Sequence, residues 1–380
     1  MVVGLGAMGS AATLHLARAG ARVIGIDSSS PPNALGSSHG DTRITRLAVG
    51  EGPAYVPLVR RSHELWREYE EELSCELLVR CGGLILGGLT SSGQHGVGNF
   101  VAATIDIARS HSIDHEILSA GEMLDRFGVL DVTDEVGYFE RSAGYLRAPA
   151  CIRAQHELAV RAGATIRVNE PVLGWSATTT GVRVETKEEA VDASVLVLTA
   201  GPWLPSLEPG LEPLLSVQRQ VQFWFEMERD ADRFSELPVF IWMHGIEEGA
   251  YLYGFPAIDG PSGGVKVATE VFADATSPLD VERRVTDDEA ERMHSTHVRG
   301  RIAGLSSRCV RSAVCLYTVT PDFGFIIDWL PEHRNVLVAS PCSGHGFKHS
   351  AAVGECVAQV ALTGSSSIDI SAFRLDRFIS

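Results

Sequence analysis

Three glycines near the start of the chain have the spacing of a phosphate-binding loop. Gly4, Gly6 and Gly9 follow the pattern G-x-G-x-x-G in MVVGLGAMGS, and Asp27 lies 23 residues after Gly4. In such a loop the first glycine permits a tight turn, the second lets the backbone approach a pyrophosphate, and the third lets a helix pack closely on a strand. The aspartate can accept hydrogen bonds from an adenosine ribose. The pattern predicts a dinucleotide site and leaves FAD and NAD open.

This motif requires a strand before the glycines and a helix after them. Residues 2–3 form a short apolar run, residues 10–20 (SAATLHLARAG) have the character of a helix, and residues 21–27 (ARVIGID) indicate a buried strand. Phosphates would then lie at the N-terminus of the helix, where free N–H groups and the helix dipole favour negative charge. The local sequence therefore provides the elements that a nucleotide site needs.

The composition excludes several classes of function. A length of 380 residues indicates two domains, and a net charge of −16 disfavours nucleic acid or an anionic membrane as a partner. No apolar run approaches the ~20 residues that span a bilayer, and the start lacks the basic region of a signal peptide. The seven cysteines include no C-x-x-C pair. This predicts no metal site, and it indicates reduced thiols in a cytoplasmic protein.

Later elements predict that the nucleotide domain is discontinuous. Residues 150–168 indicate a helix that leads into a strand, and 195–201 (VLVLTAG) resemble a parallel strand that stops beside a cofactor. From about residue 217, alternating segments such as QVQFWFEM and GGVKVATE indicate an antiparallel sheet in a second domain. Residues 335–340 (NVLVAS), a glycine-rich turn and a helix then repeat the strand–glycine–helix pattern. The middle of the chain therefore supplies a substrate domain.

Three blocks of sequence resemble one known family. They are GSSHGDTRITRLAVGEGPAYVPL (36–58), CLYTVTPDFGFIID (315–328) and SGHGFKHS (343–350). In order and spacing the chain resembles the monomeric sarcosine oxidase and N-methyltryptophan oxidase family, flavoprotein amine oxidases whose FAD is attached through a cysteine. The resemblance covers nearly the whole chain. It implies an α/β fold with a discontinuous, glutathione-reductase-like, Rossmann-type FAD-binding domain (1–79, 147–216 and 322–380) and a mixed, largely antiparallel-sheet substrate domain (80–146 and 217–321).

The resemblance assigns residues to the flavin. Cys315 in RSAVCLYTVTPD matches the flavin-bearing cysteine, with Cys309 as a rival, and a neighbouring positive charge would favour the attacking thiolate. Lys266 in GGVKVATE matches a lysine beside the flavin ring, where a cation stabilises negative charge that develops on oxygen. The other residues implied at the cofactor are Gly4, Gly6, Gly9, Asp27, Ser38, His39, Arg43, Gly201, Trp203, Gly344, Gly346, Phe347 and Lys348.

The resemblance also assigns residues to the substrate. Arg46 and Lys348 match residues that hold the substrate carboxylate, and Tyr317 matches a tyrosine close to it. An arginine fork suits a carboxylate because it is planar and bidentate, while lysine adds a point charge. No side-chain base is required, because a neutral amine loses a hydride directly. His39 and Glu270 tune the protonation of the amine, and Arg43 completes the catalytic set that the resemblance implies.

Two positions depart from the family. Ser38 stands before His39 where the family usually has two adjacent histidines. Glu270, four residues after Lys266, stands where sarcosine oxidases have a histidine. On a strand these two positions face the same side, so we expect Glu270 to point into the pocket. Fructosyl-amino-acid oxidases, which are relatives of this family, have a glutamate there to meet a polar arm of the substrate.

The sequence therefore predicts an FAD-dependent oxidase of a secondary amino acid. A hydride equivalent passes to flavin N5, the imine hydrolyses, and O₂ is reduced to H₂O₂. The expected partners are a small amine and O₂, and the family favours a monomer. A fructosyl-amino-acid (Amadori product) oxidase and a catalytically silent flavin-fold protein remain alternatives. An NAD-dependent dehydrogenase would leave Cys315 and residues 343–350 without a role.

Overall fold

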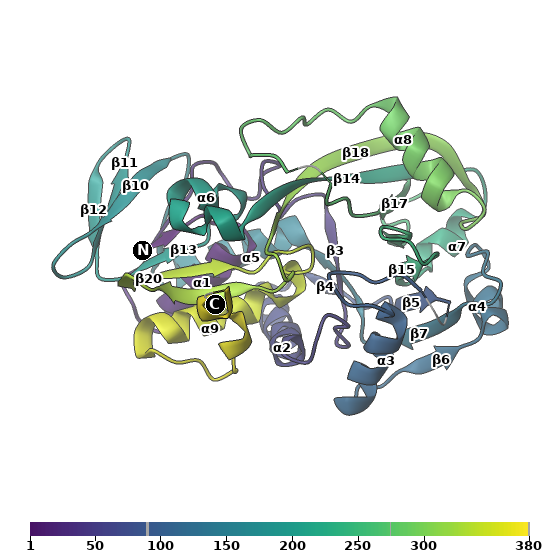
Figure 1. Cartoon of the computed structure of the whole chain (residues 1–380), viewed down its shortest axis with the longest axis horizontal. Coiled ribbons are helices and arrows are strands. Elements are labelled where there is room, and N and C mark those ends of the chain that lie inside the picture. Colours follow the sequence, from purple (N-terminus) through teal and green to yellow (C-terminus); the bar gives the residue numbers. More distant parts are fainter. Residues whose placement is uncertain (89–90, 274, 379–380) are drawn as a thin grey trace.

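Two large sheets lie at opposite ends of the molecule (Figure 1). The computed structural model describes residues 1–88, 91–273 and 275–378. One sheet has six strands in the order β19-β20-β13-β1-β2-β9, and the other has eight in the order β18-β14-β17-β16-β15-β5-β7-β6. Two three-stranded sheets, β3-β8-β4 and β10-β11-β12, accompany them.

The six-stranded sheet is parallel except at its β19 edge. Its central strands β1 and β13 are short, apolar and buried along their whole length, as a parallel sheet covered by helices requires. The strands are β1 (Val2–Val3), β2 (Ile24–Ile26), β9 (Thr165–Arg167), β13 (Leu196–Leu198), β19 (Ile326–Leu330) and β20 (His333–Ser340). The helices at this end of the molecule are α1 (Ala7–Arg18), α2 (Tyr55–Leu73), α5 (Ala148–Arg161) and α9 (Ser350–Thr363).

Glycines allow helix α1 to pack closely on both sides. A Cβ atom at Gly9 would lie 1.8 Å from the carbonyl oxygen of Gly4, and one at Gly354 in α9 would lie 2.3 Å from Cβ of Ala11. Gly4 itself has φ of +90°, in the region that favours glycine. The third glycine of the motif thus serves the packing that the sequence predicts for it.

The eight-stranded sheet is mixed, because β5 and β15 run parallel within an otherwise antiparallel arrangement. Its strands are β5 (Gly83–Gly87), β6 (Glu116–Leu118), β7 (Val136–Glu140), β14 (Ser216–Met227), β15 (Val239–Met243), β16 (Tyr251–Gly254), β17 (Val265–Ala268) and β18 (Leu305–Val319). The helices at this end of the molecule are α3 (Phe100–Ser110), α4 (Ala120–Phe127), α7 (Ala231–Ser235) and α8 (Asp287–Met293).

Strand β14 sets the register of the residues expected at the flavin. It pairs with β18 so that Gln220 lies opposite Cys315, and with β17 so that Trp224 lies opposite Lys266.

The smaller elements are β3 (Thr42–Thr45), β4 (Leu78–Val79), β8 (Gly144–Arg147), β10 (Val172–Ala177), β11 (Val182–Thr186), β12 (Ala190–Ala193), α6 (Leu204–Leu207), η1 (Gly201–Trp203), η2 (Pro209–Leu214), η3 (His294–Val298), η4 (Phe347–His349), η5 (Ser371–Phe373) and η6 (Leu375–Phe378).

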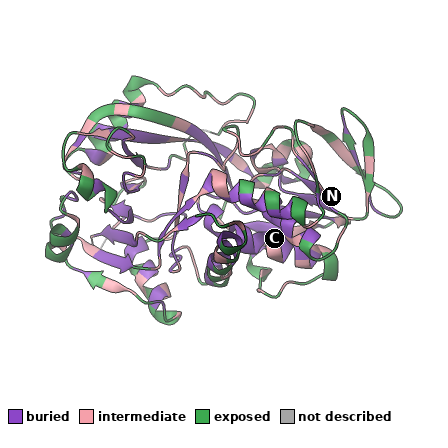
Figure 2. Ribbon diagram, turned by 180° about the vertical axis from the view of Figure 1, so that it is seen from behind, coloured by how far each residue is buried: buried purple, intermediate pink, exposed green. Residues whose placement is uncertain are grey.

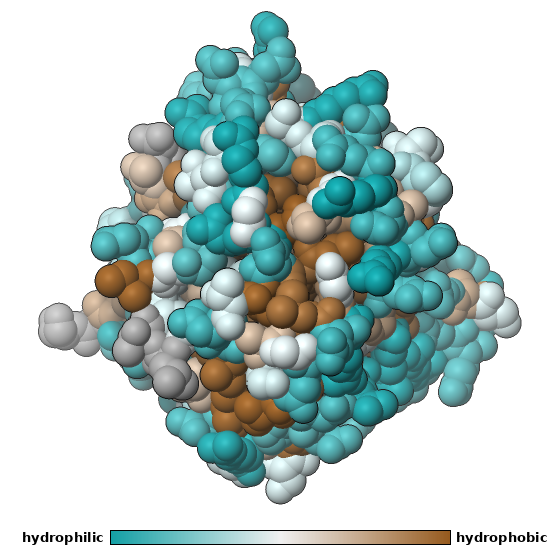
Figure 3. Space-filling view, turned by 90° about the vertical axis from the view of Figure 1, so that its right-hand side faces the viewer, coloured by the Kyte–Doolittle hydropathy of each residue, from teal (hydrophilic) through white to brown (hydrophobic). Residues whose placement is uncertain are grey.

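Burial is concentrated on the two large sheets and the helices beside them, whereas outer helix faces are exposed (Figure 2). The β10-β11-β12 sheet is mixed, because Val182 and Val184 of β11 are buried while their neighbours Arg183 and Glu185 are exposed. On the end face formed by the eight-stranded sheet and its helices, hydrophobic atoms gather near the centre and polar atoms surround them (Figure 3). Within the described ranges, no helix combines the length and the apolar character that crossing a bilayer would take.

Most elements predicted from the sequence are confirmed, with two differences at their ends. Helix α1 begins at Ala7 rather than Ser10, because the glycine turn leads directly into it. Strand β17 ends at Ala268. Glu270 therefore lies beyond the strand, whereas the sequence predicted that it lies on the strand. The boundaries that we predict between the two domains remain a prediction.

Because α1 and α9 approach closely at Gly354, adding one methyl group there should destabilise the protein. Gly354→Ala should lower the free energy of unfolding by about 1–3 kcal/mol, because the added Cβ overlaps Ala11. Gly121→Ala in α4 is the matched control, since a Cβ there meets nothing within 4 Å and alanine favours the helix. Urea unfolding measures both variants, and equal stability of the two would contradict the packing.

Candidate active site

One cavity of about 400 Å³ extends between the glycine loop and the eight-stranded sheet. Most residues expected at the cofactor or substrate line it: Gly4, Gly6, Asp27, Ser38, Arg43, Arg46, Gly201, Trp203, Lys266, Glu270, Tyr317, Gly344, Gly346, Phe347 and Lys348. Gly9, His39 and Cys315 lie behind this wall, where all three are buried. The cavity therefore brings together residues from both ends of the chain and from both large sheets.

The nucleotide end of the cavity fits a dinucleotide. Helix α1 begins at Ala7, and its N-cap residue, Gly6, has no side chain to cap it, so the helix N-terminus is available to a phosphate. Ala7 N donates a 3.3 Å hydrogen bond to Ser38 Oγ. Asp27 lies at the cavity, where its carboxylate accepts hydrogen bonds from the backbone N–H groups of Leu5 (2.7 Å) and Ser29 (2.9 Å). These contacts hold the carboxylate where a ribose would be expected.

Cys315 is fully buried on β18, next to the wall of the cavity. Its sulfur accepts a 3.6 Å contact from the amide nitrogen of Gln222, and Gln222 itself lines the cavity. Burial raises the pKa of this thiol, while the positive charges of Arg43 and Lys266 oppose that rise. The two cations are the feature that would favour a thiolate at this position.

Lys266 is held by backbone carbonyl groups. Its Nζ donates to the carbonyl oxygens of Gly40 (2.7 Å) and Thr42 (2.9 Å), and it lies 4.5 Å from the ring centre of Phe255. Burial lowers the pKa of Lys266 well below its usual value, and Arg43 lowers it further. The lysine is therefore a cavity residue rather than one of the surface lysines that are common in proteins.

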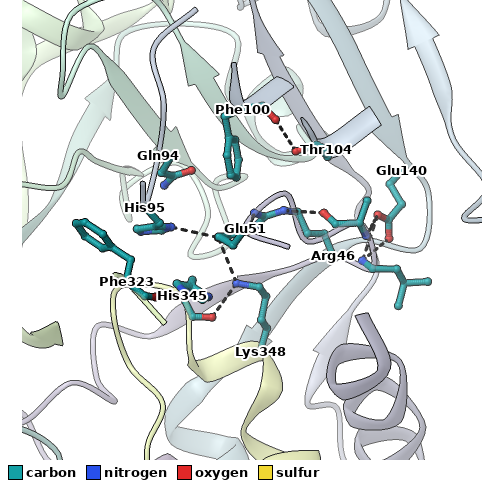
Figure 4. Close-up of polar contacts among 12 residues, drawn as sticks. Arg46, Glu51, Gln94, His95, Phe100, Thr104, Glu140, Phe323, His345 and Lys348 are labelled. Atoms are coloured by element: carbon teal, nitrogen blue, oxygen red, sulfur yellow. Dashed lines mark hydrogen bonds and ion pairs between the residues drawn. The ribbon is translucent and has the colours of Figure 1, made fainter. Parts of the chain in front are cut away.

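The two cations expected to hold a substrate carboxylate already contact a carboxylate of the chain, Glu51 (Figure 4). Arg46 Nη2 lies 2.8 Å from Glu51 Oε2, and Arg46 Nε donates to the carbonyl oxygen of Ala48 at 3.1 Å. Lys348 Nζ donates to the carbonyl oxygen of His345 at 2.7 Å and lies 3.9 Å from Glu51 Oε1. Burial lowers the pKa of Lys348 to about 7, although Glu51 opposes the shift.

Glu270 lies in the cavity wall, as expected, but it has partners within the chain. Its Oε2 accepts from the hydroxyl of Tyr251 (2.6 Å) and the amide nitrogen of Gln94 (3.2 Å), and it lies 2.9 Å from Nε2 of His95. Burial alone would raise the pKa of Glu270, but His95, Tyr251 and Gln94 lower it. The three neighbours all contact Oε2, so the expectation that Glu270 meets a polar arm of the substrate stays a prediction.

Four residues of this site were not found from the sequence: Glu51, Gln94, His95 and Tyr251. Glu51 lies within the block 36–58 that carries the resemblance, so that block offered a signal. Gln94 and His95 lie between β5 and α3 in a segment without helix or strand periodicity. Nothing in their local sequence indicates that they reach the cavity.

Comparison with known proteins decides the nature of the cofactor. The model of the FAD dependent oxidoreductase (DAO) family matches residues 1–360 of this chain. The chain belongs to this family. It is similar to monomeric sarcosine oxidase from Streptomyces avermitilis, with 39% identity over 98% of this chain and 96% of that protein. It is also similar to N-methyl-L-tryptophan oxidase from Salmonella heidelberg, with 34% identity over 100% of this chain and 98% of that protein.

Solved structures support the same fold. NikD, an unusual amino acid oxidase essential for nikkomycin biosynthesis, has a TM-score of 0.84 at 23% identity over 98% of this chain and 96% of its own. The fructosyl amine: oxygen oxidoreductase Amadoriase I from Aspergillus fumigatus has a TM-score of 0.76 at 18% identity over 98% of this chain and 88% of its own. The family, the fold class and the enzyme class predicted from the sequence are confirmed, and FAD is the cofactor rather than NAD.

The lowered pKa of Lys348 predicts how this FAD-dependent oxidoreductase binds small carboxylates. Acetate should bind progressively more weakly as the pH rises from 6 to 8, because Lys348 loses its proton near pH 7. Titration of acetate into the FAD-loaded enzyme, followed by flavin absorbance, measures this dependence. Lys348→Met should bind acetate weakly and evenly over the same interval. An unchanged profile in that variant would show that another group titrates.

Proposed function

We propose that this enzyme oxidises secondary amino acids of the sarcosine or N-methyl amino acid type and produces H₂O₂. The observation that carries the proposal is the pair of buried cations, Arg46 and Lys348, in the wall of the cavity that extends from the FAD loop. Similarity to sarcosine and N-methyl-L-tryptophan oxidases supports the substrate class. When bound, FAD accepts a hydride equivalent from the carbon beside the amine nitrogen and passes the electrons to O₂.

In this proposal the substrate carboxylate binds to Arg46 and Lys348. Arg46 offers a planar fork and Lys348 a point charge, so together they orient the amine. Glu51 contacts the same two cations, and the incoming carboxylate has to share them with it. Tyr317 presents a neutral hydroxyl, because burial raises its pKa well above the usual value. These residues bind and orient the substrate without removing a proton from carbon.

Two further groups adjust charge near the reacting atoms. Burial and the Arg43 guanidinium lower the pKa of His39 to about 4, so its imidazole is neutral at pH 7. We propose that this neutral ring favours the unprotonated amine, which alone can lose a hydride. We also propose that Lys266 stabilises the negative charge that develops on oxygen, since its Nζ is held by two carbonyl oxygens inside the cavity and acts there as a hydrogen-bond donor. The lowered pKa of Lys266 makes this effect smaller than that of a fully charged ammonium group.

We propose that FAD is attached covalently through Cys315. The support is the pair of cations that oppose the rise in its pKa and the contact between its sulfur and Gln222 in the cavity wall. The rival Cys309 is half-buried and contacts the carbonyl oxygen of Arg311, and burial raises its pKa with neither Arg43 nor Lys266 opposing the rise. The Cys315 sulfur would bond to the 8α-methyl carbon of the flavin as that carbon loses a proton, and the two electrons released would pass through the flavin to O₂.

A fructosyl-amino-acid oxidase is the second candidate. The position of Glu270 in the cavity wall and the fold similarity to Amadoriase I favour it. The three neighbours of Glu270 contact only Oε2, which leaves Oε1 as an acceptor for a hydroxyl group. We rank this candidate second because the chain is similar to sarcosine and N-methyl-L-tryptophan oxidases over nearly its full length. We also propose that the protein acts as a monomer in the cytoplasm, where its seven unpaired cysteines would stay reduced. Light scattering of the purified protein would test the monomer.

The proposed substrate class predicts the outcome of a peroxide assay. N-methyl amino acids should yield H₂O₂, and fructosyl amino acids should yield much less. Arg46→Lys should lower kcat/KM for the acids roughly 30- to 150-fold, because lysine does not reproduce the bidentate contact. The methyl ester of a good substrate should react as poorly. If ester and acid reacted equally well, Arg46 and Lys348 would not hold the carboxylate.

The covalent link predicts a single modified peptide. Mass spectrometry of a tryptic digest should find FAD on the peptide that contains Cys315, and acid precipitation should leave the flavin with the protein. Cys315→Ser should release its flavin on precipitation, whereas Cys309→Ser should retain it. A yellow, active preparation with an unmodified Cys315 peptide would rule out the link.

A further inference from the structure

A histidine that has no role in the proposed reaction joins the two acidic side chains of the cavity wall. Nδ1 of His95 lies 3.2 Å from Oε1 of Glu51, and Nε2 lies 2.9 Å from Oε2 of Glu270. All three side chains are only 3% exposed. Figure 4 shows the His95 ring directed at Glu51, on the side opposite Arg46. Because solvent screens these groups so little, their charges act strongly on one another.

Packing holds the ring in this place. His95 follows β5 in the segment 91–99, where it has φ of 50° and lies in the turn between the bridged residues Gln94 and Val97. Its ring lies 5.9 Å from that of Phe323 and 4.9 Å from that of His345, measured between ring centres. Burial lowers the pKa of His345 well below its usual value, so that histidine is neutral and does not replace the charge of His95.

The charges in this network leave room for one more anion. Below about pH 7, where Lys348 is protonated, three positively charged side chains take part: Arg46, Lys348 and His95. They face two carboxylates, those of Glu51 and Glu270. A substrate carboxylate on Arg46 would bring the two signs into balance. Without His95 it would be a third anion beside two cations, and a buried charge without a partner is costly.

We propose that His95 determines the substrate class of the cavity, because it supplies the third cation that lets an amine with a carboxylate bind in preference to a plain amine. This inference deepens the proposed function and rests on its placement of the carboxylate at Arg46. His95 does not touch the substrate in this arrangement. It acts through Glu51 and Glu270, whose negative charges would otherwise repel an anionic ligand.

The same arrangement predicts a pH dependence with a defined sign. The charged or titratable groups that face the ring are Glu51, Glu270 and His345, with Lys348 on the far side of Glu51. Burial alone would lower the pKa of His95, but Glu270 and Glu51 raise it to about 9. The affinity that His95 provides is therefore present below pH 9 and lost as the pH rises through about 9. The loss of the Lys348 proton produces a separate step in carboxylate affinity, near pH 7.

Acetate binding to the FAD-loaded enzyme tests the inference without relying on turnover. His95→Gln should bind acetate roughly 10- to 100-fold more weakly than wild type at pH 6, where Lys348 is protonated, and should lack the step near pH 9. His95→Lys should recover part of the affinity, since it restores a charge. His244→Gln is the matched control. His244 contacts His297 at 3.0 Å, does not line the cavity, and has a pKa lowered to about 4, so it is neutral.

Turnover provides the second measurement. The preference for sarcosine over dimethylamine, which lacks only the carboxylate, should fall in His95→Gln by the same factor as acetate affinity. Unchanged acetate affinity, or a retained step near pH 9, would overturn the inference even if peroxide is formed. If His95→Gln weakens acetate but the wild type makes no peroxide from any secondary amino acid, the inference stands and the proposed function fails. Recovery by His95→Lys excludes a fault in folding as the cause.

Discussion

The buried carboxylate of Glu51 is the constraint on which the rest of the site depends. A carboxylate that is 3% exposed needs cations around it, and Arg46, Lys348 and His95 come from three separate parts of the chain to provide them. Burial would raise the pKa of Glu51, yet these neighbours hold it well below its usual range. The segments before α2, after β5 and before α9 are thereby fixed relative to one another at the substrate end of the cavity.

Each of the two large sheets positions residues on one side of this cavity. The six-stranded sheet places the glycine loop and the start of α9 at one side. On the other side, β14 aligns β17 and β18 through backbone pairing, so that the Lys266 and Cys315 positions follow from strand register. Register is strongly specified where one face of a strand is buried. The cofactor side of the site therefore rests on regular structure, whereas the polar wall at the substrate side rests on loops.

This division between regular structure and loops explains which parts of the site could be predicted from the sequence. The glycine motif and the alternating strands were predictable, because local periodicity and motif spacing encode them. The cavity position of Lys266 followed from the family resemblance instead. The partners of Glu270 were not predictable, since Gln94 and Tyr251 lie 176 and 19 residues away and meet it only through the path of the chain in space. The expectation that Glu270 lies on a strand failed for a local reason: β17 ends two residues earlier, at Ala268.

The order of the strands in the six-stranded sheet has a consequence for how the protein is made. β1 carries the glycine loop at the very start of the chain, yet its neighbour β13 is paired in turn with β20, and α9 packs against α1. A ribosome therefore releases the nucleotide loop long before residues 333–363 can enclose it. N-terminal segments usually fold first during synthesis. Here the glycine loop after β1 can complete its packing only when β20 and α9, near the other end of the chain, have been made. The nucleotide site is therefore enclosed only after residues 333–363 have been made, and until then β1 and β13 lack partners that bury them in the folded sheet.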